Sequence, residues 1–135
     1  MTRGPKPDVI VAGSSPVTEV PNPPAWLSRD ARAEWRRVAP ILIHERRTLT
    51  LADLSILANY CAAIGQVSEA GRILKREGMT YRSPTGPKKH PAVSILSDGM
   101  TQARQMAGEL GLTPASRSRP AIREDNGEDL SDLDL

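Results

Sequence analysis

The side chains best suited to chemistry are basic, and they gather in the segment YRSPTGPKKHPA, residues 81–92. Arg82, Lys88 and Lys89 flank the tetrapeptide Ser83–Gly86, in which Pro at the second position and Gly at the fourth favour a type I turn. Guanidinium and ammonium groups bind phosphate oxygens, and prolines stiffen a segment, which lowers the entropic cost of binding. The segment therefore predicts a projecting hairpin that contacts phosphate or a neighbouring subunit, without reading bases.

A second basic candidate is the pair Arg46–Arg47, which follows His44 and Glu45. The predicted DNA-binding set is therefore Arg82, Lys88 and Lys89, with Arg46 and Arg47 next. The chain has two Trp, two Tyr and no Phe, which argues against a surface that binds single strands by stacking on their bases. The simpler alternative is that these basic side chains are only solvated.

Charge is segregated along the chain. Residues 124–135, EDNGEDLSDLDL, hold six acids and no base, whereas residues 1–123 hold all 18 Lys and Arg against ten acids, a net charge of +8. A basic body favours phosphate as a partner, and an acidic tail favours a protein partner or the masking of basic surface. The alternative is that these charges only keep the protein soluble and bind no partner. The residues expected to bind a protein partner are Asp125, Glu128, Asp129 and Asp132.

Residues that could act in catalysis are few. The chain has no phosphate-binding loop, dinucleotide fingerprint or nucleophile elbow. His44 stands in a charged run, which is typical of a surface side chain, and Cys61 lies on an apolar stripe, which is typical of a small core residue. One Cys and two His cannot form a four-ligand zinc site. We therefore expect no catalytic residue, no metal and no cofactor, and thus no enzyme.

The elements that must position the basic residues begin with a flexible, basic, Pro-rich arm at residues 1–25. Ser28 is suited to cap a first helix. Pro40 should kink or end that helix, and a short second piece can follow at 41–45. The apolar stripe of this helix is Ala31, Trp35, Val38 and Leu42.

Two long helices are expected to follow. Thr50–Asp53 matches a capping box for the second helix, and Gly78 is typical of its end. Pro91 suits the first turn of the third helix, and Gly111 suits its end. A 3-4-3-4-3 apolar spacing in the third helix predicts antiparallel packing against the second, through Val93, Leu96, Met100, Ala103, Ala107 and Leu110.

The expected fold class is mainly α: a long antiparallel helical hairpin plus a shorter N-terminal helix, with a small β-hairpin-like elbow between the long helices. Gly65, Gly71 and Gly99 suggest close helix contacts or bends. The helical domain is expected at 26–119 and an acidic flexible tail at 120–135. Because the core holds few aromatic residues, we expect association into oligomers. No apolar stretch approaches the roughly 20 residues that span a bilayer, so a soluble intracellular protein is expected.

Several short motifs in a fixed order resemble a widespread branch of the small terminase subunits of tailed phages. The resemblance covers about residues 23–119. Its motifs are Pro-Pro-x-Trp-Leu-Ser (23–28), Ala-x-x-Glu-Trp-Arg-Arg (31–37), Leu-Thr-x-x-Asp (49–53), Tyr-Cys (60–61), Gly-Met-Thr with Ser-Pro-Thr-Gly and His-Pro-Ala (78–92), and Leu-Gly-Leu-Thr-Pro-Ala-Ser-Arg (110–117).

The resemblance implies a DNA-packaging component in the cytoplasm of an infected bacterium. Such a protein would assemble into a homo-oligomeric ring, bind viral double-stranded DNA and hand it to a large subunit that carries the ATPase and nuclease. The resemblance assigns the basic body to DNA and the acidic tail to the large subunit. The competing hypotheses are a dimeric DNA-binding regulator of transcription, with half-sites about one helical turn apart, and a structural adaptor that does not bind DNA.

Overall fold

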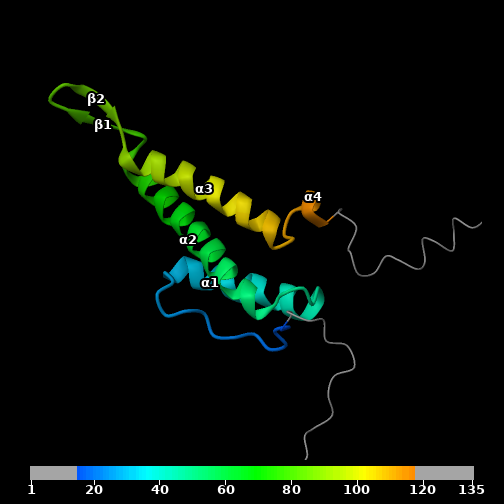
Figure 1. Ribbon diagram of the computed structural model, residues 1–135. Helices are drawn as coiled ribbons and strands as arrows, with labels where there is room; N and C mark the ends of the chain where they lie inside the picture. Colours follow the sequence, from blue (N-terminus) through cyan, green and yellow to red (C-terminus); the bar gives the residue numbers. More distant parts are fainter. Residues whose placement is uncertain (1–14, 118–135) are drawn as a thin grey trace, which may run out of the picture.

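The computed structural model describes residues 15–117 and shows a mainly helical protein with a β-hairpin at one end (Figure 1). Two long helices, α2 (Leu54–Glu77) and α3 (Pro91–Glu109), run antiparallel and are joined by strands β1 (Thr80–Ser83) and β2 (Gly86–Lys89). The shorter α1 (Arg29–Pro40) packs against α2, and a one-turn helix, α4 (Pro114–Arg117), follows α3. The expected fold class is confirmed.

The first helix begins and ends as its sequence indicates. The Ser28 hydroxyl accepts a hydrogen bond from the backbone N–H of Ala31 at 3.2 Å, which satisfies one donor that the helix itself leaves unpaired. α1 ends at Pro40, and a wider π-helical turn continues through Ile41–Glu45. This turn closes where the N–H of Arg46 donates to the carbonyl of Ile41 at 2.9 Å.

The second helix has the predicted capping box. The Asp53 carboxylate accepts from the backbone N–H of Thr50 at 3.0 Å, ahead of a short 3-10 turn, Leu51–Asp53, that leads into α2. α2 ends at Gly78, whose φ of 87° lies in the left-handed region that glycine adopts without a steric penalty. Capping residues act within three positions of sequence, which is why these boundaries could be predicted.

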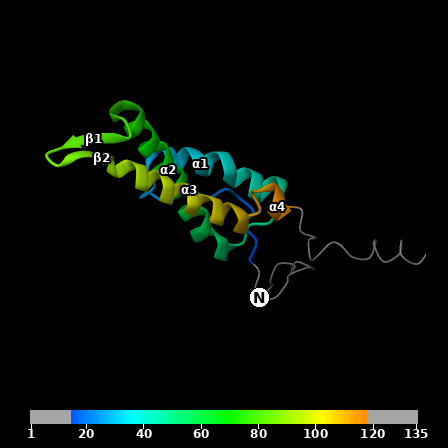
Figure 2. The ribbon, with the colours of Figure 1, turned by 90° about the horizontal axis from the view of Figure 1, so that it is seen from above.

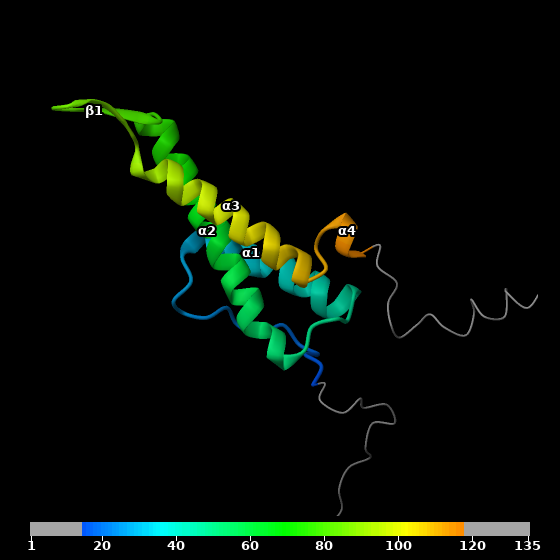
Figure 3. The same ribbon diagram turned by 45° about the horizontal axis from the view of Figure 1, so that its top comes forward.

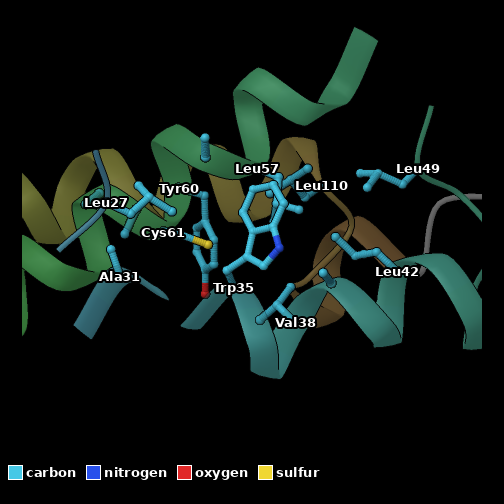
Figure 4. Close-up of a cluster of buried hydrophobic side chains, with 14 of the residues drawn as sticks. Leu27, Ala31, Trp35, Val38, Leu42, Leu49, Leu57, Tyr60, Cys61 and Leu110 are labelled. Atoms are coloured by element: carbon cyan, nitrogen blue, oxygen red, sulfur yellow. The ribbon is translucent and has the colours of Figure 1, made fainter. Parts of the chain in front are cut away.

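The core lies where α1, the first half of α2 and the end of α3 meet (Figure 4). Trp35 and Val38 of α1 face Leu57 and Cys61 of α2, and Leu110 closes the cluster from the end of α3. The cluster contains one tryptophan and one tyrosine, and its other members are mostly Ala and Leu. It therefore supports the expectation of a core with little aromatic content.

Two glycines mark the closest helix contacts. A Cβ at Gly65 of α2 would lie 2.7 Å from the Ser28 hydroxyl and 3.0 Å from the Ala31 nitrogen, so α1 crosses α2 at this point. A Cβ at Gly99 of α3 would lie 2.9 Å from a Val67 methyl of α2. These two close contacts confirm the prediction from sequence, whereas Gly71 has no atom within 4 Å of its Cβ position and marks no contact.

The packing face of α3 differs from the predicted heptad in one respect. Met100 was expected on the buried face, but its side chain is 53% exposed. The buried positions are Ala92, Gly99 and Ala103 instead. These small residues let α3 approach α2 more closely than a methionine would, and the helix is turned so that Met100 faces outward.

Residues 15–25, which the sequence assigns to the arm, lie along the helices as an extended strap. The N–H of Val17 donates to the carbonyl of Leu49 at 3.0 Å, and the N–H of Leu51 donates to the carbonyl of Ser15 at 2.8 Å. The indole N–H of Trp35 donates to the carbonyl of Pro21 at 2.9 Å. The strap therefore covers the start of α2, and residues 1–14 of the predicted arm lie outside the described residues, as does the predicted acidic tail at 120–135.

Candidate nucleic-acid interface

The β-hairpin projects beyond the ends of α2 and α3, away from the core (Figures 1 and 3). Its register pairs Ser83 with Gly86 across the turn. The Ser83 hydroxyl donates to the Gly86 carbonyl at 2.6 Å and accepts from the N–H of Thr85 at 3.3 Å, which fixes the turn. The predicted elbow is thus a short, internally bonded hairpin.

The three basic side chains of the hairpin lie on both of its faces. Residues that pair across antiparallel strands point to the same side, and successive residues point to opposite sides. The pairs Thr80–Lys89 and Arg82–Pro87 therefore place Arg82 and Lys89 on one face, while the pair Tyr81–Lys88 places Lys88 on the other. All three are exposed, and none makes an ion pair within residues 15–117. The hairpin therefore presents positive charge on both of its faces.

The base of the hairpin is held by His90. Its backbone N–H donates to the carbonyl of Met79 at 2.7 Å, and its ring Nδ1 accepts from the N–H of Ala92 at 3.0 Å. Because Nδ1 accepts, Nε2 carries a proton and donates to the Glu77 carboxylate at 2.8 Å. This hydrogen bond lowers the pKa of Glu77 below its ordinary value. The bonds tie the hairpin to the last residue of α2 and the first turn of α3.

Arg46 and Arg47 precede the start of α2, and Arg46 contacts Gly111 just beyond the end of α3, so this pair lies at the end of the long helices opposite the hairpin and the structure does not bring the two predicted basic groups together. The Arg46 guanidinium donates to the carbonyl of Gly111 and thereby joins the end of the π-helical turn after α1 to the loop after α3. Arg47 is exposed, with a φ of 54°, and lines a shallow hollow beside Pro16 and His44. Of the pair, Arg47 has the more accessible side chain.

A third basic group was not predicted as a site. Arg29, Arg32 and Arg36 are spaced i, i+3 and i+7 on the side of α1 that faces away from the core, and we name them the arginine stripe. Arg29 and Arg36 are exposed and Arg32 is half-buried. The spacing itself is visible in the sequence, and it becomes informative once the opposite side of α1 is known to be buried.

On the side of α1 that is turned away from the arginine stripe, a buried polar network joins α1 to α2. The Glu34 side chain is almost fully buried, and its carboxylate accepts from the Arg37 guanidinium at 2.6 Å and from the Tyr60 hydroxyl at 2.6 Å. Desolvation acts to raise the pKa of Glu34, but the bonds from Arg37 and Tyr60 outweigh it and the pKa is lowered. Every charged member is paired, so the network is suited to joining helices and not to proton transfer.

Groups that could serve catalysis are not assembled in residues 15–117. Cys61 is fully buried, and this burial raises the pKa of its thiol to about 12, which makes it unreactive. A hollow of about 330 Å³ lies between the strap and α2 and is lined by Trp26, Trp35 and Leu54 with no ionisable side chain. The described residues hold no group of three potential metal ligands. No helix among them is long and apolar enough to cross a membrane.

The acidic residues predicted to bind a protein partner, Asp125, Glu128, Asp129 and Asp132, lie outside the described residues.

Comparison with known proteins gave a family match over most of the chain. A family model described as "Phage terminase, small subunit" matches residues 31–127, which include both long helices, the hairpin and all but the first two residues of α1. Comparison with curated proteins and with solved structures gave no match.

Proposed function

The chain belongs to the phage terminase small-subunit family, and on this premise we propose that it binds viral double-stranded DNA and delivers it to a large terminase subunit. The observation that carries the DNA-binding part is the hairpin, whose Arg82, Lys88 and Lys89 are exposed and have no acidic partner in the described residues. Arg47, and with it Arg46, would add contacts at the other end of the molecule. Phosphate contacts of this kind position a protein on a duplex without reading its sequence.

We further propose that several copies assemble into a ring. Large apolar side chains remain on the surface, and Trp26 is 62% exposed. Ile95 of α3 is 46% exposed, and Ile56 and Ile73 of α2 are half-buried, so these isoleucines could add to a second apolar face. Contacts between unlike faces of neighbouring copies close into a ring when the rotation between copies divides a full turn. A ring would set many basic hairpins around one duplex.

The chemistry of packaging would reside in the large subunit. The described residues offer paired charges and an apolar hollow, which suit binding and assembly. The acidic tail, through Asp125, Glu128, Asp129 and Asp132, would contact the large subunit, because a dense run of acids favours a basic protein surface. The site of action would be the cytoplasm of the infected bacterium.

A recruitment assay tests whether this protein brings the large subunit to DNA through its acidic tail. Viral duplex DNA is immobilised, and retention of the large subunit of the same phage is measured with and without the small subunit. We expect the full-length protein to increase retention several-fold. Replacing the six tail acids by Asn and Gln should abolish this increase while duplex binding by the small subunit persists.

Two outcomes of the assay would contradict the proposal. Equal retention of the large subunit with and without this protein would refute delivery. Full recruitment by the variant with a neutral tail would show that the large subunit is contacted elsewhere on the chain.

A further inference from the structure

The arginine stripe of α1 has no ion-pair partner of its own among residues 15–117, although Arg29 lies close enough to Asp30 to help lower the pKa of that carboxyl. The two acids of α1 are already engaged, Asp30 with Arg72 of α2 at 2.5 Å and Glu34 with Arg37 at 2.6 Å. Within residues 15–117, none of Arg29, Arg32 and Arg36 makes an ion pair. The stripe is therefore a row of three cations, about 10 Å long at the rise of an α-helix, that is free to bind an anionic partner.

The same chain contains an acidic segment whose negative charge complements the positive charge of the arginine stripe. Residues 124–135 hold six acids and no base. Fully extended, these twelve residues span about 40 Å, which is several times the length of the stripe. Because acids occur throughout the segment, different parts of it can place carboxylates beside the three arginines.

The residues between α4 and the acidic segment are long enough for that segment to reach the arginine stripe. α4 lies near the C-terminal end of α1 in two views (Figures 1 and 2), and the contact of Arg46 with the Gly111 carbonyl ties these regions together. From Arg46 to Arg36 is about 15 Å along the helix. Residues 118–123, which connect α4 to the acidic segment, span up to about 20 Å. The acidic segment can therefore begin beside Arg36 and continue toward Arg29.

We propose that the acidic tail, residues 124–135, binds the arginine stripe of its own chain and excludes nucleic-acid phosphates from it. Each exposed ion pair is weak, so the contact depends on several pairs together and is readily displaced by salt or by a competing anion. A large subunit that takes the tail would uncover the stripe at the moment of delivery. This last consequence, and the competition with DNA, rest on the proposed function, whereas the contact between tail and stripe does not.

The contact is tested without DNA. A fluorescein-labelled peptide of residues 124–135 is titrated, at low salt, with full-length protein whose own six tail acids are replaced by Asn and Gln. We expect the peptide to bind, and we expect R29Q, R32Q and R36Q together to weaken binding by about tenfold, as the loss of three exposed pairs implies. The matched control is the hairpin variant R82Q, K88Q and K89Q, which removes equal charge and should bind the peptide unchanged. Circular dichroism confirms that each variant remains helical.

Each result has a defined meaning. No binding of the peptide, or equal loss in both variants, would overturn the proposal, and loss only in the hairpin variant would move the tail to the hairpin. A second measurement uses labelled duplex: neutralising the tail should tighten DNA binding, and this gain should vanish when the stripe is also neutralised. Peptide binding without any duplex binding would keep the contact and refute the proposed function instead.

Discussion

Replacing Arg82, Lys88 and Lys89 by glutamine is expected to reduce the affinity for double-stranded DNA on the order of 100-fold at physiological salt. The estimate follows from counterion release, which contributes about 0.9 to the salt slope for each phosphate contact. Removing three contacts should lower the slope of log affinity against log salt by about 2.7. Fluorescence anisotropy of a labelled duplex, titrated at several salt concentrations, measures both quantities.

The control for the hairpin variant removes the same charge from dispersed positions. Lys75, Arg104 and Arg117 lie on three different helices and are exposed. Replacing these three by glutamine should change the slope much less, because they form no cluster that a duplex backbone can follow. An unchanged affinity and slope in the hairpin variant, or an equal loss in the control, would refute the assignment of the hairpin.

Gly65→Ala is expected to destabilise the protein by up to about 2 kcal/mol. The added methyl group would lie 2.7 Å from the Ser28 hydroxyl and 3.0 Å from the backbone nitrogen of Ala31. The hydroxyl can rotate away only by giving up the cap of α1, and the backbone can move only with the whole helix. Overpacking of this kind costs about 1–3 kcal/mol, which exceeds the gain of about 1 kcal/mol from the higher helix propensity of alanine.

Gly71→Ala provides the matched comparison in the same helix. Nothing lies within 4 Å of a Cβ at Gly71, so only the propensity gain remains and stability should rise by about 0.5–1 kcal/mol. Urea denaturation of both variants at one fixed protein concentration measures the difference, because association changes apparent stability. Stabilisation by both substitutions would contradict the close crossing of α1 and α2.

The boundaries of the elements could be predicted because their causes are local. The Ser28 hydroxyl acts three residues ahead, and the capping box joins Thr50 to Asp53 across the same spacing. Gly78 ends α2 through its own positive φ. The turn of the hairpin depends on four consecutive residues. In each case the residue that determines the structure lies within one turn of the place that it affects.

Features that depend on long-range packing could not be predicted in the same way. The rotation of α3 that exposes Met100 arises because Gly99 fits against Val67 of the other long helix. The strap is held by pairing with Leu49 and Leu51, more than thirty residues away in sequence. Proline content indicated a segment without helix or sheet, but it could not show that the segment lies against α2.

The candidate site was predicted in part. The projecting hairpin followed from its turn residues, and the structure describes it with the register that places Arg82 and Lys89 together. The separation of Arg46 and Arg47 from the hairpin depends on the length and direction of α2, and the contact of Arg46 with Gly111 depends on the return of α3. The arginine stripe required knowledge of which side of α1 is buried.

The native mass of the purified full-length protein tests the central claim most directly, because the proposed ring is what would set many basic hairpins around one duplex. Native mass spectrometry or sedimentation at micromolar concentration gives the number of copies. We predict one discrete closed assembly of roughly eight to ten subunits, as contacts between unlike faces of neighbouring copies allow. A monomer would contradict the ring, and a dimer would contradict it in favour of a DNA-binding regulator.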